Sequence, residues 1–122
     1  MLLRLAVCCA VLVAASVGPV YAGGGDARSE ARAQVDFGID VAQRGLWREA
    51  IYRWEQAVEI DPTYAAAFNN LGVAYEHEGD FEKAAQAYKK ALALEPENAQ
   101  IRQNYELFRE INDRRSTATE TP

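Results

Sequence analysis

Residues 31–64 and 65–98 are two consecutive segments of equal length that repeat the same order of residue types. Aligned without gaps, glycines match glycines, alanines match alanines and large apolar residues match one another. The matched pairs are Phe37 with Leu71, Gly38 with Gly72, Val41 with Tyr75, Gly45 with Gly79, Trp47 with Phe81, Ala50 with Ala84, Trp54 with Tyr88, Ala57 with Ala91 and Pro62 with Pro96. Such a period is the signature of stacked repeats, in which each unit buries its apolar face against its neighbours.

Each repeated unit is predicted to be a pair of helices. In the second unit Phe81, Ala84, Tyr88 and Ala91 recur at helical spacing and therefore share one face. A helix stop and a capping residue precede this run, at Gly79-Asp80. The first unit repeats the arrangement, so the sequence predicts an all-α fold.

Gly38 and Gly72 fall inside the first helix of their units, where glycine costs about 0.5–1 kcal/mol relative to alanine. We expect each glycine to face a large ring of the second helix, which approaches too closely for any side chain. Ala50 and Ala84 are the small residues that allow the same approach from the other helix.

The second unit resembles the tetratricopeptide repeat (TPR) in its large apolar, Leu-Gly, tyrosine, alanine and proline positions. Those positions are held by Phe68, Leu71-Gly72, Tyr75, Ala84, Tyr88, Ala91 and Pro96. The first unit departs from the pattern at Gln34 and Val41. The resemblance implies antiparallel helix hairpins in a right-handed superhelical segment, of a small exported bacterial type.

The expected TPR domain spans residues 29–115, with repeats at 31–64 and 65–98 and a capping helix at 99–115. The capping helix keeps an apolar face but carries Arg102 and Glu106 where the repeat has an apolar residue and glycine. A polar-backed helix is suited to end an array. Residues 23–28 are expected to be a flexible N-terminus and residues 116–122 a disordered tail.

The first 22 residues have the pattern of a secretory signal peptide, with Arg4 before an uncharged apolar run and small residues before Gly23. We expect cleavage after Ala22 and a periplasmic or secreted protein. An uncleaved membrane anchor is the alternative, but the apolar run is shorter than the ~20 residues that span a bilayer. Both cysteines, Cys8 and Cys9, lie in this segment, so no disulfide is expected in the mature chain.

A net charge of −5 disfavours nucleic acid and anionic membrane surfaces as partners, because phosphate binding needs a basic patch. The only histidine, His77, has no neighbouring nucleophile or second ligand motif, and no glycine-rich phosphate loop is present. We therefore expect no catalytic, cofactor-binding or metal-binding residue. Trp47 and Trp54 are interpreted as core residues, since they match Phe81 and Tyr88.

Two rows of residues recur once per unit away from the packing face. One row is Asp36, Asn70 and Asn104, and the other, apolar row is Ile39, Val73 and Leu107. The TPR resemblance implies that the first helix of each unit lines a concave surface, where amides such as Asn70 hold a peptide backbone. The alternative is that Asn70 follows a repeat preference and the apolar row is shallow core. The predicted partner-binding residues are Asp36, Ile39, Asn69, Asn70, Val73, His77, Asn104 and Leu107.

These patterns together indicate a non-catalytic adaptor of the bacterial envelope that binds a protein or peptide segment in the concave groove. No stable membrane insertion is expected after signal cleavage. The alternative is a structural subunit that forms a homodimer or docks onto a larger repeat assembly, because about three repeats are usually needed for independent stability.

Overall fold

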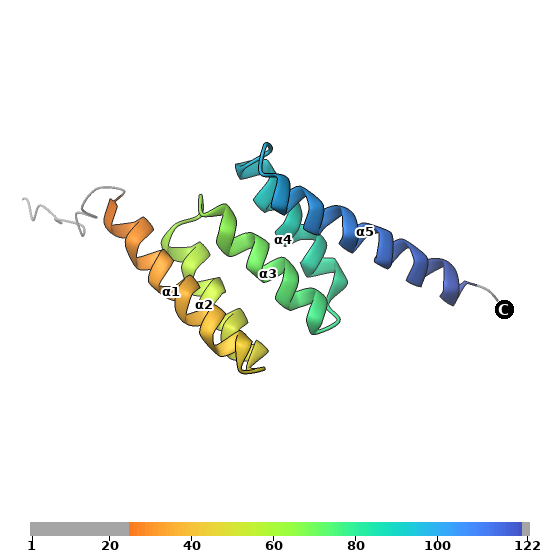
Figure 1. Ribbon diagram of the computed structural model, residues 1–122, viewed down its shortest axis with the longest axis horizontal. Helices are drawn as coiled ribbons and strands as arrows, with labels where there is room; N and C mark the ends of the chain where they lie inside the picture. The colour runs from red at the N-terminus through yellow and green to blue at the C-terminus, as the bar shows by residue number, and fades with distance from the viewer. Residues whose placement is uncertain (1–24, 121–122) are drawn as a thin grey trace, which may run out of the picture.

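The computed structural model describes residues 25–120, which form five α-helices and no strand. Figure 1 shows two helix hairpins side by side, with the last helix against the second hairpin. The helices are α1 (Gly25–Gln43), α2 (Trp47–Ile60), α3 (Ala65–His77), α4 (Phe81–Leu94) and α5 (Ala99–Thr119). The prediction of an all-α fold with antiparallel hairpins is confirmed. The predicted signal peptide lies outside the described residues.

The turn inside each hairpin depends on a glycine with positive φ. Gly45 has φ 79° and Gly79 has φ 81°, a left-handed conformation that L side chains rarely adopt. After the second turn the Asp80 carboxylate accepts a hydrogen bond from the backbone N–H of Lys83, at 3.2 Å, and caps α4. The predicted helix stop and cap between α3 and α4 are therefore present.

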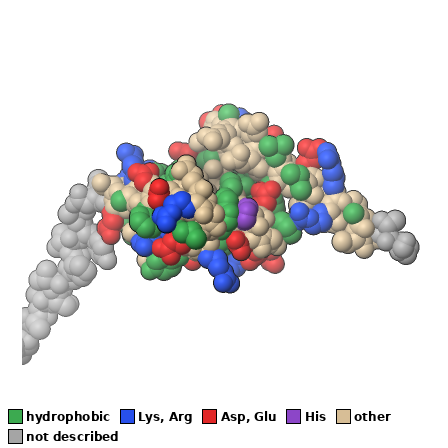
Figure 2. All heavy atoms as spheres, turned by 60° about the horizontal axis from the view of Figure 1, so that its bottom comes forward, with side chains coloured by type: hydrophobic (Ala, Val, Ile, Leu, Met, Phe, Trp, Pro, Cys, Tyr) green, Lys and Arg blue, Asp and Glu red, His purple; other side chains and the backbone are tan. Residues whose placement is uncertain are grey.

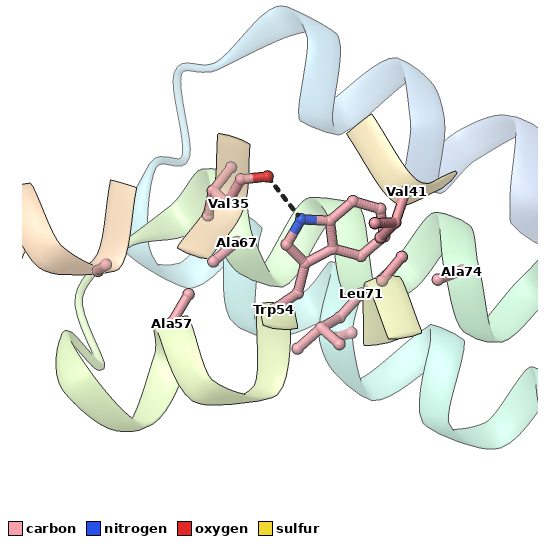
Figure 3. Close-up of a cluster of buried hydrophobic side chains, with 10 residues drawn as sticks. Val35, Val41, Trp54, Ala57, Ala67, Leu71 and Ala74 are labelled. Atoms are coloured by element: carbon pink, nitrogen blue, oxygen red, sulfur yellow. Dashed lines mark hydrogen bonds between the residues drawn. The ribbon is translucent and has the colours of Figure 1, made fainter. Parts of the chain in front are cut away.

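The two helices of each hairpin meet where a glycine faces a ring. The Trp54 indole of α2 is buried against α1, and its Nε1 donates a hydrogen bond to the carbonyl oxygen of Val35, at 3.1 Å (Figure 3). A β-carbon at Gly38 would lie 2.3 Å from that nitrogen, and one at Gly72 would lie 2.7 Å from Cδ1 of Tyr88. The predicted role of both glycines is confirmed.

The two hairpins share one apolar cluster, and α5 packs against the second hairpin in two further clusters. Three residues of α3, Ala67, Leu71 and Ala74, pack in the same cluster as Trp54 (Figure 3). At the other end the Phe108 ring of α5 lies 5.4 Å, centroid to centroid, from that of Tyr88. Helix α5 therefore covers the second hairpin as the first helix of a further repeat would.

Both ends of the helical region extend beyond the expected bounds. Residues 25–28, expected to be flexible, belong to α1, because Arg28 forms an ion pair with Asp61 and lies 4.5 Å from the Tyr64 ring centroid. Residues 116–119, expected to be disordered, continue α5. There the Ser116 hydroxyl donates to the carbonyl oxygen of Asn112, at 3.1 Å. Figure 1 shows this end of α5 projecting past the hairpins.

Candidate functional site

A groove of about 280 Å³ opens between α1 and α3, and we call it the α1–α3 groove. Ile39 and Val73 occupy the same position in successive repeats, and they remain 39% and 37% exposed. Exposed branched side chains at matched positions make a continuous apolar strip across the two helices. The groove is lined by Ile39, Ala42, Gln43, Trp47, Trp54, Asn70 and Val73.

Trp47 forms one wall of the groove and is only partly buried. Its indole stacks on the His77 imidazole, with 4.1 Å between ring centroids and 21° between ring planes. In Figure 2 the histidine side chain, in purple, lies beside hydrophobic side chains at the surface. Trp54 is 3% exposed, which confirms its interpretation as a core residue. Trp47 contacts the core with part of its ring and lines the groove with the rest.

The three asparagines of the predicted set have different surroundings. Asn70 lines the α1–α3 groove and is partly buried. Asn69 instead accepts a hydrogen bond at its Oδ1 from Nδ2 of Asn104, at 3.0 Å, which links α3 to α5. Neither residue of this pair lines the groove.

The remaining predicted residues stand farther from the groove. Asp36 is an exposed residue of α1, and Leu107 is an exposed residue of α5. Neither lines the groove. The structure therefore brings together Ile39, Asn70 and Val73, with His77 at the edge against Trp47.

Sequence reasoning missed four lining residues, Ala42, Gln43, Trp47 and Trp54. A signal for Gln43 was present, because it follows Ile39 by four residues and so lies on the same helix face. The position of Trp47 depends on the turn into α2, where Leu46 provides no side-chain cap. No local pattern predicts the direction of that indole.

The groove has the chemical character of a binding site. Its lining offers aliphatic and aromatic carbon with amide groups at Gln43 and Asn70, which can each donate and accept hydrogen bonds. Among residues 25–120, no group of three or more His, Cys, Asp or Glu side chains could hold a metal ion. The stacked hairpins and this groove define a helical repeat protein.

Comparison with known proteins agrees with this class. The family described as tetratricopeptide repeat matches residues 65–98, and a second family, described as TPR repeat, matches residues 41–79. The C-terminal TPR-containing domain of a Plasmodium falciparum FK506-binding protein superposes with a TM-score of 0.65 at 26% sequence identity. The match covers 77% of this chain and 61% of that domain. Tetratricopeptide repeats are therefore shown for residues 41–98.

Curated relatives share only this region. The type IV pilus assembly protein PilF of Pseudomonas aeruginosa is 38% identical over 64% of this chain and 31% of its own length. The Hsp70-Hsp90 organizing protein of Triticum aestivum is 40% identical over 43% of this chain and 9% of its own length. A probable N-acetylglucosaminyltransferase, SPINDLY of Hordeum vulgare, is 36% identical over 52% of this chain and 7% of that enzyme.

This chain thus spans less than a third of each of these curated relatives. Tetratricopeptide repeats generally mediate protein–protein interaction and are typically non-catalytic. Within the described residues, no helix is long and apolar enough to cross a membrane.

Proposed function

We propose that this protein is a non-catalytic adaptor that binds a peptide segment of a partner protein in the α1–α3 groove. The observation that carries the proposal is the exposure of Ile39 and Val73 beside Asn70 in one cavity. A bound segment would place apolar side chains against the strip and backbone groups against the amide. Trp47 supplies a large apolar surface of the kind that anchors interfaces.

The remaining predicted residues would extend this contact. Asp36, Asn104 and Leu107 continue the two rows along α1 and α5, and His77 closes one edge through its stack on Trp47. Asn69 would act indirectly, through its hydrogen bond to Asn104. A segment longer than the groove itself would therefore meet further polar and apolar groups on the same side of the array.

Peptides selected from a random library against the chain test this proposal. We expect the selected peptides to lose about tenfold or more in affinity for Val73→Lys, because an unpaired ammonium would be desolvated in the groove. Ala93→Lys places the same side chain at an exposed position of α4 outside the groove lining and serves as the matched control. Equal affinity for wild type and Val73→Lys would exclude the groove as the binding site.

One observation favours the alternative of self-association or docking onto a larger repeat assembly. Phe37 is 47% exposed on α1, whereas Leu71, its counterpart in the next repeat, is 3% exposed because α2 covers it. Among residues 25–120, no helix covers this N-terminal face as α2 covers the corresponding face of the second repeat. Sedimentation over a range of concentrations distinguishes a homodimer from a monomer, and Phe37→Glu should abolish any dimer formed through this face.

We further propose that the protein acts in the bacterial envelope, as a small exported TPR protein. The proposal rests on the signal-like pattern of residues 1–22 and is supported by the similarity to a type IV pilus assembly protein. N-terminal sequencing of the exported protein tests it. A chain beginning at Gly23 supports export by a cleaved signal, and an intact Met1 in that fraction contradicts it.

A further inference from the structure

A second hollow lies between α2 and α4, and we call it the α2–α4 pocket. Its volume is about 440 Å³ and its floor is the face of α3 that carries Phe68, Leu71 and Tyr75. The middle of this face lies about 160° around α3 from the midpoint of Asn70 and Val73, since each helical residue turns by about 100°. The pocket is therefore separate from the α1–α3 groove. Its walls are Glu55 and Val58 on one side and Lys83, Gln86, Ala87 and Lys90 on the other.

Lysine in this acidic chain is confined to α4, and two of the three lysines line the pocket. All three lysines of the sequence, Lys83, Lys89 and Lys90, lie on α4, although the chain carries a net charge of −5. The corresponding residues of α2 are Glu49, Glu55 and Gln56. The repeat itself therefore does not require lysine at these positions.

The two lysines that line the pocket stand over the aromatic rings of its floor. Nζ of Lys83 is 5.6 Å from the ring centroid of Tyr75, and Nζ of Lys90 is 6.0 Å from that of Phe68. Their seven-residue separation places them about 10 Å apart along α4. The ion pair of Lys83 with Asp80 is 3.9 Å long and solvent-exposed, so a ligand carboxylate could replace it at little cost.

The one carboxylate that lines the pocket already has a partner. Oε1 of Glu55 accepts a hydrogen bond from the Tyr75 hydroxyl, at 2.6 Å. Burial first, and then this contact, raise the pKa of Tyr75, so the phenol stays protonated and keeps donating. Glu55 keeps its negative charge, but its Oε1 is occupied by the Tyr75 hydroxyl and it forms no ion pair with Lys83 or Lys90, so the α4 wall presents two ammonium groups above an apolar floor.

We infer that the α2–α4 pocket binds an acidic segment of a partner protein, in which a large apolar side chain lies between two carboxylates about 10 Å apart. The apolar side chain packs on Phe68 and Leu71, and the carboxylates pair with Lys83 and Lys90. In a polyproline II segment, which has three residues per turn and a rise of about 3.1 Å per residue, residues three apart lie on the same side and span about this distance. The site is independent of the α1–α3 groove, so each proposal can fail without the other.

A short synthetic peptide with aspartates flanking a Leu-Phe pair tests the inference, titrated into the full chain by calorimetry. We expect saturable binding that weakens with added salt, because the ammonium groups are at the solvent-exposed rim. The double variant Lys83→Glu/Lys90→Glu should lose about tenfold or more in affinity. Lys89→Glu makes the same charge change on the same helix outside the pocket lining, and we expect affinity within about twofold of wild type.

Three controls make the result decisive. A peptide with lysines in place of the aspartates should not bind, and amide resonances of Val58 and Ala87 should shift on titration while those of Ile39 and Val73 do not. Circular dichroism melting should be unchanged in all lysine variants, because these side chains are exposed. The inference is overturned if the double variant binds as wild type does, if Lys89→Glu weakens binding equally, or if octanoate binds as tightly as the peptide.

Discussion

The indole of Trp54 occupies the space that a side chain at position 38 would need, since a β-carbon there would lie 2.3 Å from its Nε1. Tyr88 stands in the same relation to Gly72, at 2.7 Å from Cδ1. Both glycines lie within helices and have no other backbone requirement. The contact between the helices of each hairpin therefore explains why glycine, a poor helix former, is present.

Gly72→Ala should destabilise the protein although alanine is the better helix former. The ring of Tyr88 is buried and cannot swing away, so we expect a loss of about 1–3 kcal/mol in the free energy of unfolding. For a domain of this size, each kcal/mol lowers the melting temperature by about 4–8 °C. Thermal unfolding by circular dichroism measures the change.

A double variant separates the ring contact from helix propensity. Tyr88→Leu reduces the obstacle, so Gly72→Ala should cost less in that background than in the wild type. Strictly additive losses would mean that the Tyr88 ring is not what position 72 avoids.

The repeat spacing predicted this contact because both partners of each pair recur with the unit. Contacts between parts of the chain that do not recur could not be predicted in the same way. Arg28 and Asp61 are 33 residues apart, and only the folded array places the guanidinium beside the carboxylate. The sequence therefore suggested a flexible segment at residues 23–28, whereas residues 25–28 are the first turn of α1.

Asp61 should stabilise the protein at neutral pH and lose this effect in acid. Hydrogen bonds from the Thr63 hydroxyl and then from Arg28 lower the pKa of the Asp61 carboxyl in the folded chain. The stabilisation is therefore present above the unfolded pKa of about 4 and is lost as the pH falls through the lower, folded pKa. Asp61→Asn should lower the free energy of unfolding by about 1 kcal/mol at pH near 7.

Urea unfolding at neutral and acid pH measures this difference. We expect the gap between wild type and Asp61→Asn to close in acid, where both side chains are uncharged. Asp40→Asn removes an exposed carboxylate of α1 and serves as the control, with a gap that stays small at every pH. A pH-independent gap for Asp61→Asn would contradict the charge-based explanation.

Tyr75 and Tyr88 should resist ionisation at alkaline pH. Burial first, and then the carboxylates of Glu55 and Glu76, raise the pKa of these two phenols in the folded chain. Their contribution to stability is therefore complete below the unfolded pKa of about 10 and is lost as the pH rises towards the folded values. Absorbance titration of tyrosinate should show a late step in the native chain that is absent in urea.

Tyrosine-to-phenylalanine variants show which tyrosines ionise in the late step. Tyr75→Phe should reduce its amplitude, whereas Tyr52→Phe, which changes an exposed ring, should leave the late step unchanged. A native titration curve that matches the curve in urea would mean that neither phenol is held in its neutral form.

The groove was predicted in part, and the reason lies in what a periodic pattern contains. Ile39 and Val73 hold the same position on two helices that stack side by side, and Asn70 precedes Val73 by three residues on α3, so their proximity follows from the repeat and helix periods. Trp47 was assigned to the core because Phe81 matches it, yet its ring is shared between the core and the groove. Side-chain direction at a turn depends on tertiary packing, which periodicity does not encode.

A lysine should be tolerated at position 73 and not at position 84. Val73 is 37% exposed at the rim of the α1–α3 groove, so the ammonium of Val73→Lys can reach water, and we expect a change within about 0.5 kcal/mol. Ala84 is 0% exposed and packs in the cluster that contains Tyr88 and Phe108. Ala84→Lys would bury an unpaired charge and overfill this cluster, which costs more than about 4 kcal/mol and should unfold the chain. Melting curves of the two variants decide between surface and core at position 73: if Val73→Lys unfolds as Ala84→Lys does, the apolar row is core and cannot form a binding surface.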